Sequence, residues 1–174
     1  LLRALVGQGA DPNSLSVQRI TSPSTASQWT ATYATVASGV ARAAAGAALT
    51  SDGVSTLRLW YQRSSDNSIC YRQSTDDGQT WGAEVLAATP PITQGQLCYG
   101  ICGDSNTRLW VIWASYSYAA STLYKLSYST SWTWSQEGPT QPTGWGELRG
   151  ISCYSLGGTI YFAAGVQIKT SLTG

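Results

Sequence analysis

The chain of 174 residues contains no histidine and no methionine, and it has few charged residues. Without histidine, Ser-His-Asp and Cys-His catalysis are excluded, together with the commonest zinc and copper ligand. Charged residues make up 11% of the chain and the net charge is +1, so we expect no binding to nucleic acid. No run of about 18 apolar residues occurs, so we expect no membrane insertion. No metal site and no cofactor are predicted.

The aromatic residues are unevenly distributed among types. There are 8 Trp and 10 Tyr against a single Phe, and hydrophobic residues make up 43% of the chain. Wide aromatic rings pack well on pleated sheets, and the 18 glycines suit frequent turns. The composition therefore predicts a folded, all-β protein. The chain begins at Leu1 and ends at Gly174, so we expect a fragment of a longer protein.

The four cysteines form no CxxC pair. Cys98 and Cys102 are expected on one face of a strand, roughly 13 Å apart, which is too far for a mutual disulfide. The interpretation we favour is that Cys70, Cys98, Cys102 and Cys153 are buried free thiols. A disulfide between neighbouring repeats and a metal site are the alternatives.

Tryptophan recurs at a constant spacing. Trp29, Trp81 and Trp134 each close a similar octet, and they lie 52 and 53 residues apart. A second landmark, Thr-Leu-Arg-Leu-Trp at 56–60 and Asn-Thr-Arg-Leu-Trp at 106–110, repeats after 50 residues. Landmarks that keep one period indicate a repeat protein.

Each period of about 50 residues contains four strand candidates, in the clearest unit at 40–49, 57–63, 68–74 and 81–87. A four-stranded antiparallel sheet per period is typical of a β-propeller blade. The Ala-rich first segment could also form a helix, but its position in the repeat favours a strand. We therefore expect the end of a blade at 1–37, full blades at 38–90 and 91–144, and the start of another at 145–174. Fewer than four blades would make an incomplete propeller.

The octet at 74–81 contains residues that favour a tight turn, at the positions where such a turn needs them. Asp76 can accept backbone N–H hydrogen bonds, Gly78 can adopt a positive φ, and Trp81 is expected to begin the next strand and enter the core. Ser74 and Thr80 complete the pattern Ser-x-Asp-x-Gly-x-Thr-Trp. The equivalent positions are Ser22 and Trp29 upstream, and Ser127, Thr133 and Trp134 downstream.

This octet resembles the Asp-box, or bacterial neuraminidase repeat, of sialidase-like propellers. The resemblance implies a hairpin between the third and fourth strands of a blade, with a structural role. Asp76 and Asp77 as a catalytic pair, or as calcium ligands, are weaker alternatives. The Arg-Ile-Pro signature of sialidases is absent, and no catalytic residues are predicted. Arg58 and Arg108 are repeat equivalents, which favours structural roles for both.

Aromatic residues outside the repeat landmarks are the candidate ligand-binding residues. Trp113, Tyr116, Tyr118 and Trp132 could stack on sugar rings, or could instead pack between blades. The low-charge, Ser-, Thr- and Ala-rich composition also resembles phage tail and fibre proteins. We predict a non-enzymatic scaffold or attachment module of an extracellular or virion assembly, with other copies or subunits as partners. A carbohydrate-binding module that recognises cell-surface glycans and a sialidase-like glycosidase fragment are the alternatives.

Overall fold

The computed structural model describes residues 2–6, 12–21, 24, 33–40, 47–91, 96–115, 121–137, 148–156 and 159–166. Within these ranges it leaves out the side chains at 3, 5, 6, 96–99, 112–115, 121, 122, 148–156, 159, 160 and 162–166. Every described element is a strand, so the all-β prediction is confirmed for this part of the chain. No helix in these ranges could span a membrane.

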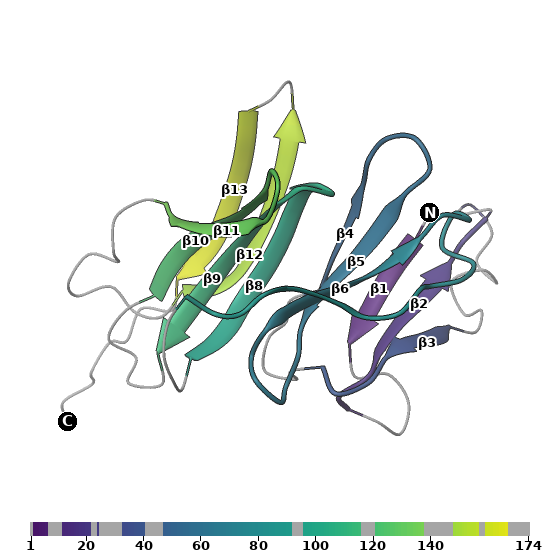
Figure 1. Cartoon of the computed structure of the whole chain (residues 1–174), viewed down its shortest axis with the longest axis horizontal. Coiled ribbons are helices and arrows are strands. Elements are labelled where there is room, and N and C mark those ends of the chain that lie inside the picture. The colour runs from purple at the N-terminus through teal and green to yellow at the C-terminus, as the bar shows by residue number, and fades with distance from the viewer. Residues whose placement is uncertain are drawn as a thin grey trace.

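In the described part of the chain, thirteen strands form four antiparallel sheets in chain order (Figure 1). The first sheet contains β1 (Leu2–Val6), β2 (Leu15–Arg19) and β3 (Ala34–Ala37). The second contains β4 (Ala47–Ser51), β5 (Leu57–Gln62), β6 (Ile69–Ser74) and β7 (Val85–Ala88). The third contains β8 (Gln96–Ser105), β9 (Arg108–Ser115), β10 (Ser121–Tyr128) and β11 (Trp132–Gln136). The fourth contains β12 (Leu148–Leu156) and β13 (Thr159–Val166).

Within each sheet, every strand pairs with the strand that follows it along the chain, as in a meander. The second and third sheets have four strands each, in the orders β4-β5-β6-β7 and β8-β9-β10-β11. Their first strands, β4 and β8, contact each other, and β8 in turn contacts β12. In Figure 1 the purple N-terminal strands lie on the right, and the green and yellow strands lie on the left.

The two central strands of the sheet β4–β7, β5 and β6, are buried on both faces. On one face Trp60 and Tyr71 pack in a cluster with Leu109, Val111 and other residues of the sheet β8–β11. On the other face Leu59, Tyr61 and Cys70 pack with Leu15 and Val17 of the first sheet. Trp60 and Tyr61 are neighbours on β5 and both are fully buried. Because successive side chains of a strand point to opposite faces, this requires a neighbouring sheet on each side.

Two boundaries differ from the expected strands. β7 begins at Val85 rather than at Trp81, because residues 75–84 form the loop that carries the octet. The first strand of that sheet is described from Ala47 onward, whereas 41–46 lie outside the described residues. Val40 forms only an isolated bridge, with Arg63.

The cysteines require two corrections. Cys102 is disulfide-bonded, so the free-thiol interpretation is wrong for this residue, although Cys70 is a buried free thiol. The expectation that Cys98 and Cys102 share a strand face is also wrong. An irregularity in the β8–β9 pairing between Cys98 and Gly100 places the two positions on opposite faces. The side chains of Cys98 and Cys153 are not described.

Candidate functional site

The loop at 75–84, which carries the octet, is organised around one carboxylate. Asp76 Oδ1 accepts hydrogen bonds from the backbone N–H groups of Gln79 (3.0 Å) and Thr80 (2.9 Å). Its Oδ2 accepts the Thr80 hydroxyl (2.6 Å), and Oδ1 also accepts the Ser74 hydroxyl (2.8 Å). The Thr80 hydroxyl and backbone, followed by Ser74, lower the pKa of Asp76 to about 2. The carboxylate is therefore ionised at neutral pH, and its oxygens are used to hold the loop.

The loop also contacts the preceding sheet. Gly78 has φ 77°, and a Cβ at this position would lie 2.9 Å from Cδ1 of Leu2 on β1. Asp77, with φ 59°, forms an ion pair with Arg19 of β2 at 2.7 Å. Trp81 packs against the cluster between the first two sheets. The loop thus connects two sheets, in addition to joining β6 to β7.

The downstream copy of the octet has a different structure. β10 ends at Tyr128 and β11 begins at Trp132, so the turn between them is short. Ser129 stands where Asp76 stands in the intact copy, so this turn lacks the carboxylate that organises the longer loop. The Thr133 hydroxyl instead donates to the carbonyl of Ser127 at 3.4 Å. Trp134 Nε1 donates to the carbonyl of Thr89 at 2.7 Å, which links this hairpin to the preceding sheet. Ser22 and Trp29 lie outside the described residues.

A hollow of about 450 Å³ lies beside the loop at 75–84, between this loop and the β4–β5 turn. The turn is held by Asp52, which accepts the N–H groups of Val54, Ser55 and Thr56 at 2.9–3.0 Å. These hydrogen bonds, led by Thr56, keep the pKa of Asp52 well below its usual range. Asp52 and Asp76 therefore each accept hydrogen bonds from the backbone of their own loop.

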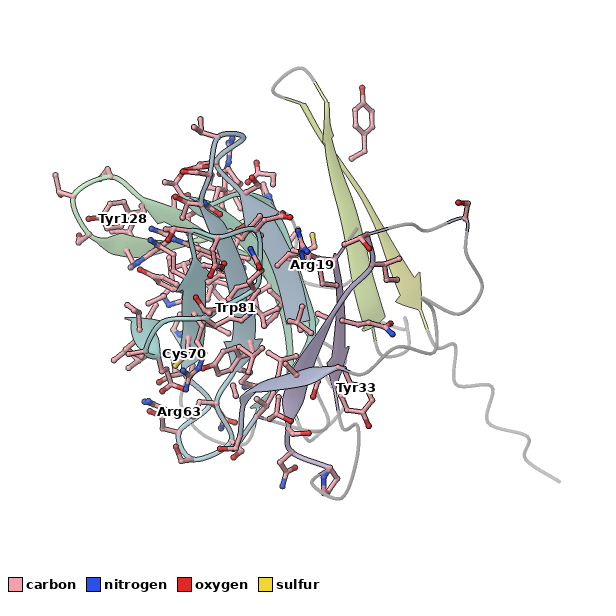
Figure 2. All side chains as sticks on the ribbon, turned by 90° about the vertical axis from the view of Figure 1, so that its right-hand side faces the viewer. Arg19, Tyr33, Arg63, Cys70, Trp81 and Tyr128 are labelled. Atoms are coloured by element: carbon pink, nitrogen blue, oxygen red, sulfur yellow. The ribbon has the colours of Figure 1, made fainter. Side chains whose placement is uncertain are left out.

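A tyrosine–glutamate pair, which sequence reasoning missed, lies at the end of the sheet β4–β7. The Tyr61 hydroxyl donates to Glu84 Oε2 at 2.7 Å, and Arg63 Nη1 contacts Glu84 Oε1 at 2.7 Å. Arg63 also binds both carboxylate oxygens of Asp66. Trp81, Cys70 and Arg63 of this region are labelled in Figure 2. No spacing signal could have paired Tyr61 with Glu84, because Glu84 lies in the loop before β7.

This pair lacks the properties of a catalytic nucleophile and base. Tyr61 is fully buried, and burial followed by the hydrogen bond to Glu84 raises the pKa of its hydroxyl well above the usual value. Burial alone would raise the pKa of Glu84, but hydrogen bonds from Tyr61 and Arg63 outweigh it, so the pKa is lowered. A neutral, inaccessible phenol beside a stabilised carboxylate cannot attack a substrate. The hydrogen bond from Tyr61 to Glu84 connects β5 to the residue that precedes β7.

The two arginines at equivalent repeat positions both have structural partners. Arg58 Nη1 donates to the carbonyl of Asn106 at 2.5 Å, and its guanidinium lies 4.5 Å from the ring centre of Tyr71. Arg108 pairs with Asp104 at 2.7 Å. Both side chains therefore have partners within the fold, as expected for arginines with structural roles.

The aromatic candidates are only partly described. Trp132 packs between sheets, with its ring centre 5.2 Å from that of Trp60 and 6.4 Å from that of Tyr71. Tyr128, on the same hairpin, is 45% exposed and is labelled at the left of Figure 2. The side chain of Trp113 is not described, and Tyr116 and Tyr118 lie outside the described residues.

Within the described part of the chain, no group of three His, Cys, Asp or Glu side chains could hold a metal ion. The chain matches no family model, no curated protein and no solved structure.

Proposed function

We propose that this chain is part of a β-propeller that serves as a non-enzymatic scaffold or attachment module of a virion tail or surface assembly. In this proposal each four-stranded sheet is a blade, and β4, β8 and β12 are the innermost strands of successive blades. The partners are other copies of the chain or other subunits of the assembly, outside the cell or on a virion.

The observation that carries the proposal is the burial of β5, a central strand of the sheet β4–β7, on both faces. Leu59 and Trp60 are both fully buried, the first against the preceding sheet and the second against the following one. Sheets that cover each other in chain order, with their first strands adjacent, are the packing that propellers use. The loop motif adds polar links between sheets, such as the Arg19–Asp77 ion pair.

The polar clusters support a scaffold rather than an enzyme. Asp52, Asp76 and Glu84 are each occupied by hydrogen bonds within the fold. The tyrosine of the Tyr61–Glu84 pair is fully buried. Electron microscopy of the intact protein or its assembly tests the architecture. We expect sheets arranged radially around a channel, and an isolated stack without curvature would overturn the propeller proposal.

A binding experiment and an activity assay separate the scaffold from its alternatives. A glycan array and a fluorogenic sialoside assay should both give signals equal to those of a denatured control. Glycan binding that is lost in Tyr128→Ala would favour the carbohydrate-binding module, since Tyr128 is the exposed aromatic of the β10–β11 hairpin. Turnover of the sialoside would favour the glycosidase.

A further inference from the structure

The disulfide of Cys102 has two possible partners. Cys102 lies on β8 and is disulfide-bonded, whereas Cys70 is a free thiol. The chain has four cysteines, so the other half of the bond is Cys98 or Cys153. We propose that the partner is Cys153, so that the bond ties β8 to β12, the first strands of two consecutive sheets.

The strand register excludes Cys98. In the β8–β9 pairing Cys98 lies opposite Trp113, and Cys102 lies opposite Trp110. Directly opposed residues of an antiparallel pair share a face, and positions 110 and 113 of β9 lie on different faces. The two cysteine positions therefore lie on opposite faces of one strand. Along that strand they are also roughly 13 Å apart, beyond the reach of a disulfide.

The face on which Cys102 lies is the one directed away from the sheet β4–β7. Ile101 and its register partner Val111 are buried in the cluster with Trp60, so their face is directed toward β4–β7. Cys102 follows Ile101 along the strand and therefore occupies the other face. Since β8 also contacts β12, this second face is the one that meets the fourth sheet.

The register of the fourth sheet places position 153 on the complementary face. Cys153 pairs with Phe162. Tyr161, next to Phe162, is 58% exposed, so its face of β13 is directed to solvent. Positions 162 and 153 therefore lie on the opposite face. That face is directed toward the third sheet, because β12 contacts both β8 and β9.

The bond forms by thiol–disulfide exchange with a low-molecular-weight disulfide as the oxidant. The thiolate of one cysteine attacks the oxidant to give a mixed disulfide and releases one thiol. The second thiolate then displaces the other half of the oxidant, so two protons and two electrons leave the protein in all. A two-stranded sheet is at best marginally stable alone, and the bond would hold β12–β13 to its neighbour. It would also require maturation in an oxidising compartment.

Peptide mapping without reduction tests the assignment. The chain is oxidised with oxidised glutathione, alkylated with iodoacetamide and digested with trypsin. Cleavage after Arg72, Arg108, Arg149 and Lys169 places Cys98 and Cys102 in residues 73–108 and Cys153 in residues 150–169. We expect these two peptides to be joined and to separate on reduction. A bridge within 73–108, with Cys153 alkylated, would overturn the proposal.

Serine variants provide matched controls. Cys102→Ser and Cys153→Ser should each remove the cross-link, and Cys98→Ser should retain it. Closing a loop of about 50 residues changes the folding equilibrium constant by about 1,000-fold, so the first two variants should match the reduced parent. A cross-link that survives in Cys153→Ser, or disappears in Cys98→Ser, would contradict the assignment. If a variant fails to fold, the map of the parent protein still decides between the two partners.

Discussion

Substitution of Gly103 by alanine should disrupt the contact between β4 and β8. A Cβ at this position would lie 2.1 Å from Cγ2 of Thr50 and 3.3 Å from Cδ2 of Leu109. Thr50 is buried, and its hydroxyl accepts a hydrogen bond from Trp60 Nε1 and donates one to Asn106 Oδ1. Rotation of Thr50 away from the new methyl group would break both hydrogen bonds. We therefore expect Gly103→Ala to lower the free energy of unfolding by about 1–3 kcal/mol, the usual cost of overpacking a core.

A compensating substitution makes this prediction specific. Thr50→Ser removes Cγ2 but keeps the hydroxyl and its two hydrogen bonds, so the double variant should recover at least half of the loss. The assay is urea unfolding followed by tryptophan fluorescence, and the control is Gly82→Ala. The nearest atom to a Cβ at position 82 is the Gln73 carbonyl oxygen at 3.4 Å, so its effect should stay within about 0.5 kcal/mol. Equal stabilities for the two glycine variants, or strict additivity with Thr50→Ser, would refute the reasoning.

Three further changes test other contacts. Asn106→Ala removes the hydrogen bonds of the side chain to Thr50 and to the Thr56 carbonyl, so urea unfolding should show a loss of about 2–4 kcal/mol; the exposed Thr107→Ala is the control, and equal losses would count against the interface. The pKa of Asp76 is about 2, below its usual 3.8, so the stability from its ionised form is present above pH 3.8 and is lost as the pH falls through about 2. The melting temperature of Asp76→Asn should therefore fall less steeply with acid than that of the parent, and equal slopes would contradict this account. Cys70 is fully buried, and burial raises the pKa of its thiol to about 12, so a disulfide reagent should label it only after denaturation; prompt labelling of the native protein would show that the site is open.

Most of the strand pattern could be predicted from the sequence. The candidates 57–63 and 68–74 correspond to β5 and β6, because short apolar segments with aromatic residues between turn signals are typical of strands. The bulge between Cys98 and Gly100 was not accessible, because it arises from the pairing of β8 with β9. Because of this bulge, Cys98 and Cys102 lie on opposite faces of the strand and not on the same face.

From the sequence, only those contacts of the candidate site that join residues close together along the chain could be predicted. Asp76 and the N–H groups of Gln79 and Thr80 lie within five residues, so turn chemistry predicts their hydrogen bonds. The Tyr61–Glu84 pair joins residues 23 positions apart, and it depends on how the loop returns to β7. Strand periodicity carries no information about such a contact, because loop residues have no fixed period.

The face-to-face packing of successive sheets is tested most directly by nuclear Overhauser effects in the unmodified, isotope-labelled protein. A Cβ built on Gly103 lies 2.1 Å from Cγ2 of Thr50, so the methyl group of Thr50 must be close to the α-protons of Gly103. We predict a strong cross-peak between them, which joins the sheet β4–β7 to the sheet β8–β11. A spectrum with the expected cross-peaks within each sheet but none between Thr50 and Gly103 would contradict the stacked arrangement.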